Sequence, residues 1–508
     1  MRAFRPVSSR GATTRIRPES SPDGNPSAAL FERGPVHRRL RVLLDVDCRI
    51  RSGDLHHDLQ LGLLSHPFVD LTRYSADGPP ADLPRKEFFS GVLYVPGWVT
   101  IYEAEEGGLA DHLMCYGNEG NATNTALTSE PFVWFAQQDT TSASYGDCSA
   151  SEAAARRGRD AMAASVAEEM SADLLITDRD YLLEDRPNRR RGDVFAVAPD
   201  DALPLVGLYL RRQGQYVFWR SADGHGSYNG TRFWFYFVAT RAVLPDSWRW
   251  VTACQRQSEG SGDDHLFFHA RSLLQRVEQA LMARDDVFAA LSAPQGPEAV
   301  EDVMMALDRL LILLNSAVDV TARVAHVVLG VHDVKESLAG WKVDGAWIKN
   351  VRQLEPQLAR LTGPGRFRDS LTILRLLRNT IHGAALGALP AHSGAVGEPV
   401  DTLVELPKSE SGVLRQCAQR QGGETSWGFS EIVPGKLHAD IATLVERLFR
   451  EVMGFLNEVM RLTPVERMPH SALTAADYGA PQAPAGVDTL TAFSDLAQSL
   501  VLAQLALP

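Results

Sequence analysis

The hydrophobic pattern of the chain changes near residue 185. Upstream of it, short apolar runs such as residues 40–46 and 172–177 are continuous rather than alternating, which is typical of strands buried on both faces of a sheet. Residues 153–170 repeat with a helical period, and Ser151 is their expected N-cap. Two further runs are strand candidates: residues 91–103 and 131–136. Strands separated by a helix indicate a parallel sheet.

Downstream of residue 185 the pattern becomes helical. A basic connector covers residues 186–198, and the segments after it carry apolar residues at helical spacing, with Gly and Pro between them. The predicted helices are residues 200–212, 233–253, 265–291, 298–329, 347–361, 367–386 and 434–462. We expect a long loop over residues 388–433 and an apolar C-terminal stretch that packs on the body or on a partner.

Composition fits a folded protein of several domains. The 508 residues are 44% hydrophobic and 22% charged, which is ordinary for a globular chain, and the length allows about three domains. We predict an α/β parallel-sheet domain followed by an all-α helical bundle. The expected segments are a disordered arm (1–37), the α/β domain (38–185), a connector and helical linker (186–262), the helical bundle (263–465) and an Ala/Pro-rich tail (466–508).

Charge and cysteine usage restrict the environment. The net charge of −12 argues against a protein that coats nucleic acid, although it leaves room for a local basic patch. The five cysteines are widely spaced and form no CxxC pair, so neither a disulfide framework nor a zinc site is expected and a reducing cytoplasm is predicted. No apolar run approaches the roughly 18 residues of a membrane span.

Acidic residues stand where strands and a helix of the predicted α/β domain begin or end. Asp45 ends the first apolar run, Asp160 lies on the helix, and Asp178 and Asp180 follow the last strand. Carboxylates outside the carboxyl ends of parallel strands can converge on one point. Mg²⁺ and Mn²⁺ prefer such oxygen ligands, and either ion can activate water against a phosphodiester. The sequence therefore predicts a metal site for phosphodiester cleavage.

These parts resemble a PIN-domain ribonuclease. VLLDVD matches the family's opening strand that ends in Asp, and DAMAASVA, ADLLIT and TDRDYL match its closing helix, strand and turn. The resemblance implies that Asp45, Asp160 and Asp178 hold Mg²⁺ or Mn²⁺, with Asp180 nearby. It also implies a second acid from an earlier element. Three residues are open candidates for that acid: Glu87, Glu103 and Glu105.

A second constellation lies on one face of the predicted helix 367–386. Arg375, Arg378, Asn379 and His382 share a polar stripe, because their separations are three, four and seven residues. Guanidinium groups bind phosphate in bidentate fashion, and an imidazole exchanges protons near neutral pH. Together such groups could cleave RNA without metal by activating its 2′-hydroxyl. A polar face that only makes interhelical hydrogen bonds is the alternative.

The stripe resembles the Arg-x4–6-His signature of HEPN-domain proteins, which are helical bundles, often dimeric. Six residues separate Arg375 from His382, which matches the signature, whereas Arg378 and Asn379 have the favoured Arg-Asn form with only three residues between Arg378 and His382. The resemblance implies a metal-independent ribonuclease site at a homodimer interface. Many members of that family instead bind partners or nucleotides.

Both resemblances point to RNA. We expect a ribonuclease of a toxin–antitoxin, phage-defence or RNA-processing type, with RNA as substrate, a homodimer through the helical domain and an antitoxin or defence partner, and no membrane contact. This step is an analogy from fold to function. Two alternatives stay open: a non-catalytic interaction or sensor protein with a degraded PIN-like domain, and a metal-dependent DNase or nucleotide phosphohydrolase.

Overall fold

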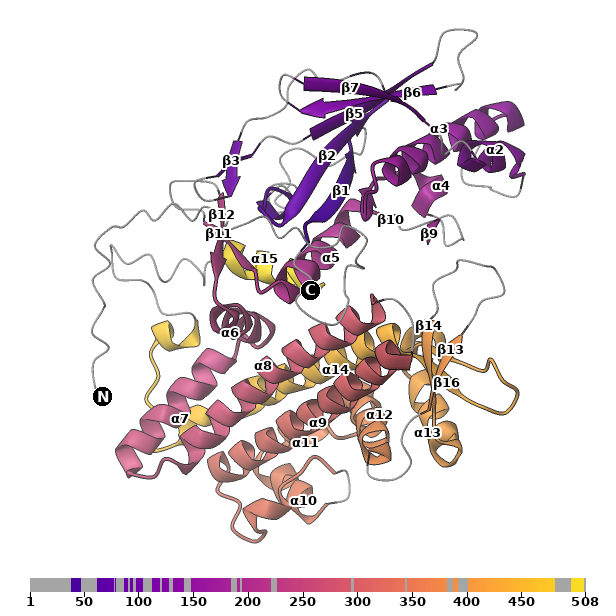
Figure 1. Ribbon diagram of the computed structural model, residues 1–508. Helices are drawn as coiled ribbons and strands as arrows, with labels where there is room; N and C mark the ends of the chain where they lie inside the picture. The colour runs from indigo at the N-terminus through magenta and orange to yellow at the C-terminus, as the bar shows by residue number, and fades with distance from the viewer. Residues whose placement is uncertain are drawn as a thin grey trace, which may run out of the picture.

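The computed structural model shows a large sheet with its helices above a long helical bundle (Figure 1). It describes residues 38–46, 62–76, 78, 86–89, 92–94, 97–103, 112–118, 121–127, 131–140, 148–183, 190–191, 194–220, 226–293, 297–342, 345–381, 387–391, 401–479 and 495–506. The expected N-terminal arm, residues 1–37, lies outside these ranges. An α/β part followed by a mostly helical part is confirmed.

The large sheet has eight strands in the order β7-β6-β5-β2-β1-β8-β10-β9. Its five central strands, from β5 to β10, are parallel, and the outer strands add in antiparallel fashion. The strands are β1 (Leu40–Asp45), β2 (Val69–Ser75), β5 (Gly97–Glu103), β6 (His112–Asn118), β7 (Asn121–Ala126), β8 (Leu174–Ile176), β9 (Arg190–Arg191) and β10 (Val194–Val197). Since β10 pairs with β8, the sheet continues past the expected domain end at residue 185.

Two local predictions in this part were wrong. Residues 131–136 belong to helix α2 (Pro131–Gln138) rather than to a strand; proline is well tolerated in a first helical turn, and α2 packs beside α3. Helix α3 (Ala150–Glu169) begins earlier than predicted, and its N-cap is Ser149. The Ser149 hydroxyl accepts from the Glu152 N–H while the Glu152 carboxylate accepts from the Ser149 N–H, which forms a capping box.

Helices cover both faces of the sheet, and the strand pleat decides which residue faces which helix. Leu43 and Leu175 belong to the core beneath α3, whereas Val42 and Leu44 pack beneath α5 (Pro199–Arg212) on the opposite face. Successive side chains of a strand point to opposite faces, which explains this division. The C-terminal stretch forms α15 (Asp495–Gln504), which packs against α5, α6 and β11 of the same chain.

A second, four-stranded sheet joins residues from two distant parts of the sequence. Its order is β11-β12-β3-β4, with β11 (Tyr216–Arg220), β12 (Gly226–Gly230), β3 (Lys86–Phe89) and β4 (Val92–Tyr94). The single helix predicted over residues 233–253 is wrong. Two helices stand there, α6 (Arg232–Val243) and α7 (Ser247–Ser261), because Pro245 interrupts the helical hydrogen bonds between them.

Long helices form the second part. They are α8 (His265–Leu291), α9 (Pro297–Val328) and α14 (Ile441–Leu462). Shorter helices accompany them: α10 (Ala346–Leu354), α11 (Pro356–Arg360), α12 (Arg366–Thr380), α13 (Lys408–Gln419), and the single turns η2 (Glu336–Leu338), η3 (Thr425–Trp427), η4 (Val465–Arg467) and η5 (Ala475–Tyr478). The short helix α4 (Asp180–Leu183) belongs to the first part, where it contacts α3. The predicted helix 347–361 is broken in two at Glu355, which precedes Pro356.

The predicted loop over residues 388–433 is also wrong. It contains α13 and most of a third sheet in the order β13-β14-β16-β15. The strands are β13 (Gly387–Ala391), β14 (Asp401–Glu405), β15 (Phe429–Ser430) and β16 (His438–Asp440). Strand β16 occupies residues that were predicted to begin the last helix, and Asp440 caps α14 by accepting from the Thr443 N–H.

No helix among the described residues is both long enough and apolar enough to cross a bilayer.

One buried histidine makes the stability of this fold depend on pH. His66 is 1% exposed in the turn before β2. Its Nδ1 accepts from the Phe68 N–H at 3.1 Å, and its Nε2 lies 3.3 Å from the Asn229 amide oxygen on β12. Burial lowers the pKa of His66 from 6.5 to about 4, although the hydrogen bond to Asn229 acts in the opposite direction.

We therefore expect His66 to destabilise the fold in mild acid. Between pH 6.5 and about 4 the unfolded chain binds a proton that the folded chain excludes, so the free energy of unfolding falls as the pH falls, by up to about 3 kcal/mol from this group. Urea unfolding of the wild type and of His66→Gln across this range should show a shallower pH slope for the variant. The same substitution at the exposed His332 serves as control; equal slopes for wild type and His66→Gln would contradict the prediction.

Candidate functional site

The candidate site lies at the point where the strand order of the large sheet reverses. β1 is followed in the sequence by β2 on one side, while β8 lies on its other side. All three strands are parallel, so their carboxyl ends share one edge. In open α/β sheets ligands bind outside this edge at the point of reversal. Asp45 is the last residue of β1, and Thr177 follows the last residue of β8.

The pleat brings Asp45 and Thr177 to the same face of the sheet. Asp45 lies two residues after Leu43, and Thr177 lies two residues after Leu175, so each points to the same face of the sheet as its leucine. Both leucines pack beneath α3. The Thr177 hydroxyl donates to Asp45 Oδ2 at 3.0 Å. Asp45 is 1% exposed, so this carboxylate is removed from bulk water and needs partners.

Helix α3 supplies the second carboxylate from above. Asp160 is buried on the side of α3 that meets the sheet, next to the fully buried Ala163 and Ala167. Their small side chains let the helix approach the strands closely. Asp160 and Asp45 therefore lie near each other although 115 residues separate them in the sequence, and a shared partner links them.

That partner is Arg179, two residues after Thr177. Its Nε donates to Asp45 Oδ2 at 2.6 Å, its Nη2 to Asp45 Oδ1 at 3.4 Å, and its Nη1 to Asp160 Oδ1 at 3.2 Å. Its guanidinium also lies over the ring of Tyr74 on β2, 5.9 Å from the centroid. Burial alone would lower the pKa of Arg179, but the hydrogen bond and charge of Asp45, together with the charge of Asp160, raise it. The guanidinium is thus a permanent cation between two carboxylates.

The other predicted acids do not join this group closely. Asp178 and Asp180 are exposed, and Asp180 begins the short helix α4. Within the described ranges, Asp45, Asp160 and Asp178 do not bring three ligand atoms within 4.8 Å of one another. The site therefore has a two-carboxylate centre with further acids at its rim.

The three candidates for the second acid are placed differently. Glu103 is the last residue of β5, so its backbone stands on the same carboxyl edge as Asp45. Glu87 belongs to β3 in the second sheet. Glu105 lies outside the described residues. Backbone position alone thus favours Glu103 over Glu87.

The donors at this point match what Mg²⁺ or Mn²⁺ takes. These ions bind through one or two carboxylates and keep several waters, and Asp45 and Asp160 already hold one cation, the guanidinium of Arg179, between them. Arg179 occupies the place between the two carboxylates where the predicted ion would bind. A metal bound by both carboxylates requires that Arg179 gives up at least part of its contact with them.

The second predicted site, the stripe on α12, is only partly described. His382 lies outside the described residues. Arg375 and Arg378 are half-buried and Asn379 is exposed. Arg375 donates through Nη2 to the Trp341 carbonyl, and burial lowers its pKa while the charge of Asp319 partly offsets that effect. Arg375 is therefore engaged in holding the segment before α10.

The side of α12 opposite the stripe is apolar. Ile373, Leu374 and Leu377 are buried against the bundle, and Ile381 packs at its edge. The Arg378 guanidinium lies 3.5 Å from the amide oxygen of its neighbour Asn379. The helix thus has the expected amphipathic division.

Sequence reasoning missed a cluster of arginines at the start of the same helix. A cavity of about 500 Å³ is lined there by Gly365, Arg366, Asp369, Arg420, Gln421, Gly422 and Arg447. Arg420 pairs with Asp369 at 2.6 Å, while Arg366 and Arg447 both pair with the fully buried Glu451. Three guanidinium groups thus face two carboxylates. No short motif marks the cluster, because the fold assembles it from α12, α13 and α14.

Sequence reasoning also gave no role to Thr177 and Arg179, although both stand within TDRDYL. Part of the signal is in the sequence, because Thr177 lies two residues after Leu175 and therefore faces the same side of the sheet. No protein-family model, curated protein or solved structure matches the chain.

The two-carboxylate centre predicts a metal-dependent rescue of stability. In Arg179→Met, Asp45 and Asp160 lose their shared cation, so we expect a loss of about 3–5 kcal/mol in EDTA. Millimolar Mn²⁺ should restore much of this loss, because a ligand that binds only the folded state stabilises it. Thermal unfolding with Mn²⁺ and with EDTA measures the effect.

A matched control is present at the opposite edge of the same sheet. Arg38 forms a buried bidentate pair with Asp173 at 2.6 and 2.8 Å. Arg38 thus contacts one carboxylate, whereas Arg179 contacts two. Asp173 keeps the backbone N–H and the guanidinium of Arg41 in Arg38→Met, so this variant should lose less stability than Arg179→Met and gain nothing from Mn²⁺. If Mn²⁺ rescues neither variant, or both equally, the pair Asp45–Asp160 does not bind the ion.

The contact of Arg375 predicts a structural defect. Arg375→Met removes the charged donor from the Trp341 carbonyl and should lower the free energy of unfolding by about 1.5–3 kcal/mol. Asn379→Ala, an exposed change on the same helix, should stay within about 0.5 kcal/mol of wild type. Urea unfolding tests both; an unchanged Arg375→Met midpoint would show that this contact contributes little.

Proposed function

We propose that this protein is a metal-dependent endoribonuclease with a PIN-like α/β domain and a HEPN-like helical domain. Systems of the toxin–antitoxin, phage-defence or RNA-processing kind are its expected setting, with RNA as substrate. The proposal includes a homodimer through the helical domain and an antitoxin or defence protein as partner. The observation that carries it is the meeting of Asp45 and Asp160 around one cation at the reversal point of the sheet.

Each residue of the centre has a part in the proposed reaction. Asp45 and Asp160 hold the ion, Thr177 fixes one oxygen of Asp45, and the exposed Asp178 stands at the rim. Mg²⁺ or Mn²⁺ bound there would supply an activated water and neutralise charge on the phosphate. Arg179 moves from the carboxylates toward the RNA phosphate, which a guanidinium binds in bidentate fashion.

The helical domain contributes contact with the RNA backbone in this proposal. The cavity at the start of α12 exposes Arg366 and Arg420, whose side chains are 55% and 56% accessible. Guanidinium groups at such an opening attract phosphate. The stripe of Arg375, Arg378, Asn379 and His382 remains the proposed metal-independent site, with Arg375 already engaged at Trp341.

One observation favours a second candidate function. Arg179 already compensates both carboxylates, as expected of a degraded PIN-like domain whose acids only stabilise the fold. The chain would then be a non-catalytic interaction or sensor protein. A third candidate, a DNase or nucleotide phosphohydrolase, uses the same metal centre on a different substrate.

The deciding experiment measures cleavage of a mixed single-stranded RNA by the full chain in Mn²⁺, in Mg²⁺ and in EDTA. Asp160→Asn keeps the size of the side chain and removes its charge, so cleavage should fall at least about 100-fold, since even changes outside the ligand set cost 10- to 100-fold. Asp201→Asn, a change at an exposed aspartate on α5, should cleave like wild type.

The other outcomes assign the activity elsewhere. Cleavage that persists in EDTA and disappears in His382→Ala would place it in the stripe on α12. Cleavage of DNA or of nucleoside triphosphates with the same metal dependence would favour the third candidate. A folded wild type that cleaves nothing in any of these conditions would leave the second candidate.

A further inference from the structure

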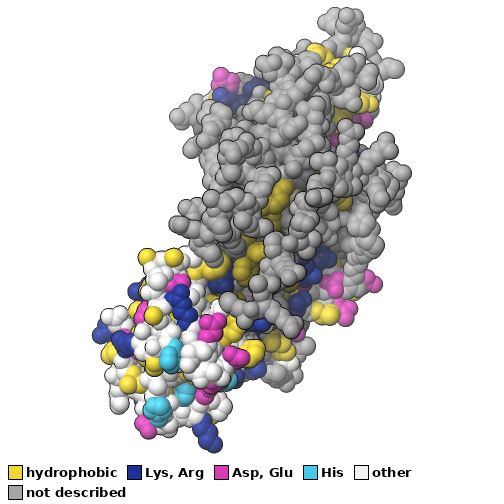
Figure 2. Space-filling model, turned by 90° about the vertical axis from the view of Figure 1, so that its left-hand side faces the viewer, with side chains coloured by type: hydrophobic (Ala, Val, Ile, Leu, Met, Phe, Trp, Pro, Cys, Tyr) yellow, Lys and Arg dark blue, Asp and Glu magenta, His cyan; other side chains and the backbone are white. Residues whose placement is uncertain are grey.

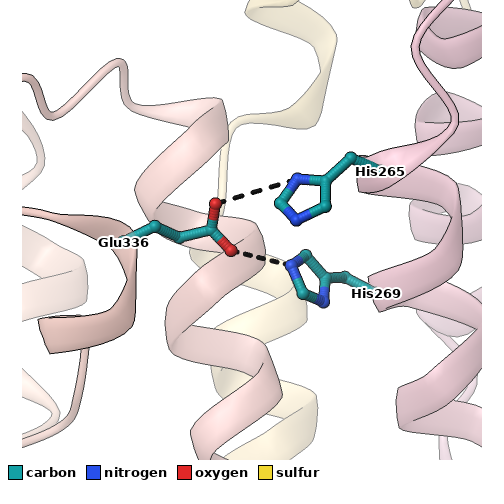
Figure 3. Close-up of side chains that lie close together, drawn as sticks. All are labelled: His265, His269 and Glu336. Atoms are coloured by element: carbon teal, nitrogen blue, oxygen red, sulfur yellow. Dashed lines mark hydrogen bonds and ion pairs between the residues drawn. The ribbon is translucent and has the colours of Figure 1, made fainter.

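The helical domain carries a group of metal-ligand side chains that is unrelated to the aspartate centre. Histidine side chains gather at one end of the helical part (Figure 2). Two of them, His265 and His269, stand one turn apart at the start of α8, and Glu336 on η2 reaches toward both (Figure 3). The rings of the two histidines lie 4.4 Å apart, centroid to centroid.

The distances among these groups suit a single ion. His269 Nε2 lies 2.7 Å from Glu336 Oε1, and His265 Nδ1 lies 3.7 Å from Glu336 Oε2. One ligand atom from each residue falls within 4.8 Å of the others, and within the described ranges no other group of three or more His, Cys, Asp or Glu does so. Residues four apart on a helix share a face, which is why both imidazoles point to the same carboxylate.

From this geometry we propose that His265, His269 and Glu336 bind one transition-metal ion of the Zn²⁺ class. Two imidazole nitrogens and one carboxylate oxygen make a mixed ligand set that Zn²⁺ accepts, whereas Mg²⁺ and Ca²⁺ prefer oxygen alone. The side chain of His265 is 51% accessible, so the fourth position is open to water. This site lies outside the proposed ribonuclease function and does not depend on it.

A simpler interpretation is that Glu336 only accepts a hydrogen bond from His269. That interpretation explains one histidine, but not why His265 turns its Nδ1 to the other carboxylate oxygen. A third histidine lies within the electrostatic reach of Glu336 but is not part of the ligand group. His326 on α9 is 9% exposed, and its Nδ1 has no hydrogen-bond partner within the described structure. The charges of Glu336 and His332 both reach this ring.

The ion would connect α8 to the segment between α9 and α10. Glu336 belongs to the segment between α9 and α10, whose far end is held by the buried Trp341. The indole of Trp341 donates to the Thr321 hydroxyl at 2.9 Å, and its carbonyl accepts from Arg375. An ion at Glu336 would fix the near end of the segment to α8. We therefore assign the site a structural role.

The local charges both oppose and support a cation here. The positive charge of Arg323 opposes a cation at His269, and the positive end of the α8 dipole lies at His265, an effect worth under about 1 kcal/mol at an exposed helix end. Asp263, which accepts from the His265 N–H at 3.0 Å, and Glu336 provide the opposite charge. Neutral imidazoles add none, so the site can hold a divalent cation.

The test is Zn²⁺ binding to the full chain, purified without a histidine tag, by titration calorimetry, with Co²⁺ absorption as a second readout. We expect one ion per chain with a Kd in roughly the micromolar range, a visible Co²⁺ spectrum, and a higher unfolding temperature with Zn²⁺. His265→Ala, a change at an exposed ligand, should weaken binding at least about 100-fold, since even changes outside a metal's ligand set cost 10- to 100-fold. His269→Gln keeps a donor for Glu336 and should also lose the ion.

Two controls make the outcome decisive. His470→Ala, a change at an exposed histidine in another part of the chain, should bind like wild type, and Asp160→Asn should leave Zn²⁺ binding unchanged even where RNA cleavage is lost. Absence of saturable Zn²⁺ and Co²⁺ binding by the folded wild type, or binding that survives both His265→Ala and His269→Gln, would overturn the proposal.

Discussion

The buried ion pair between Arg211 and Asp285 is the contact on which the arrangement of the two parts depends. Arg211 lies in the last turn of α5, which packs on the large sheet, and Asp285 lies in α8. Two hydrogen bonds of 2.6 and 3.0 Å join them. Tyr236 of α6 donates to the same carboxylate at 2.7 Å, and Arg211 also donates to the Gln504 carbonyl of α15. Four helices, including the C-terminal α15, thus meet at one charge pair. Because a buried charge without its partner is costly, these contacts specify one relative position of sheet and bundle.

A similar rule of charge balance governs the carboxyl edge of the sheet. Asp45 and Asp160 are buried acids that the fold holds together, and Arg179 lies between them. In a metal enzyme the guanidinium competes with the ion for the same oxygens; in a purely structural domain it is the ion's permanent replacement. The function of this domain therefore depends on whether a divalent cation can displace Arg179 from Asp45 and Asp160. An enzyme and a purely structural domain would use the same three side chains.

The helical part applies different ligand chemistry at its far end. His265, His269 and Glu336 offer nitrogen as well as oxygen, so an ion bound there differs in kind from an ion at Asp45. The segment that carries Glu336 also carries Trp341, whose carbonyl holds Arg375. The predicted catalytic stripe is thus tied to the segment that the histidines face.

The sequence by itself determined the elements whose signals are local. Continuous apolar runs indicated β1 and β8, helical periodicity indicated α8 within its observed bounds, and strand-end acids marked the edge where Asp45 lies. Only the tertiary structure decided the rest. Residues 131–136 became a helix and residues 388–433 a sheet with a helix because of what they pack against. Arg179, the arginines around Glu451 and the pair of histidines with Glu336 come together across long sequence separations. Local sequence patterns do not predict such contacts, because these contacts depend on which distant side chain the folded backbone brings within reach.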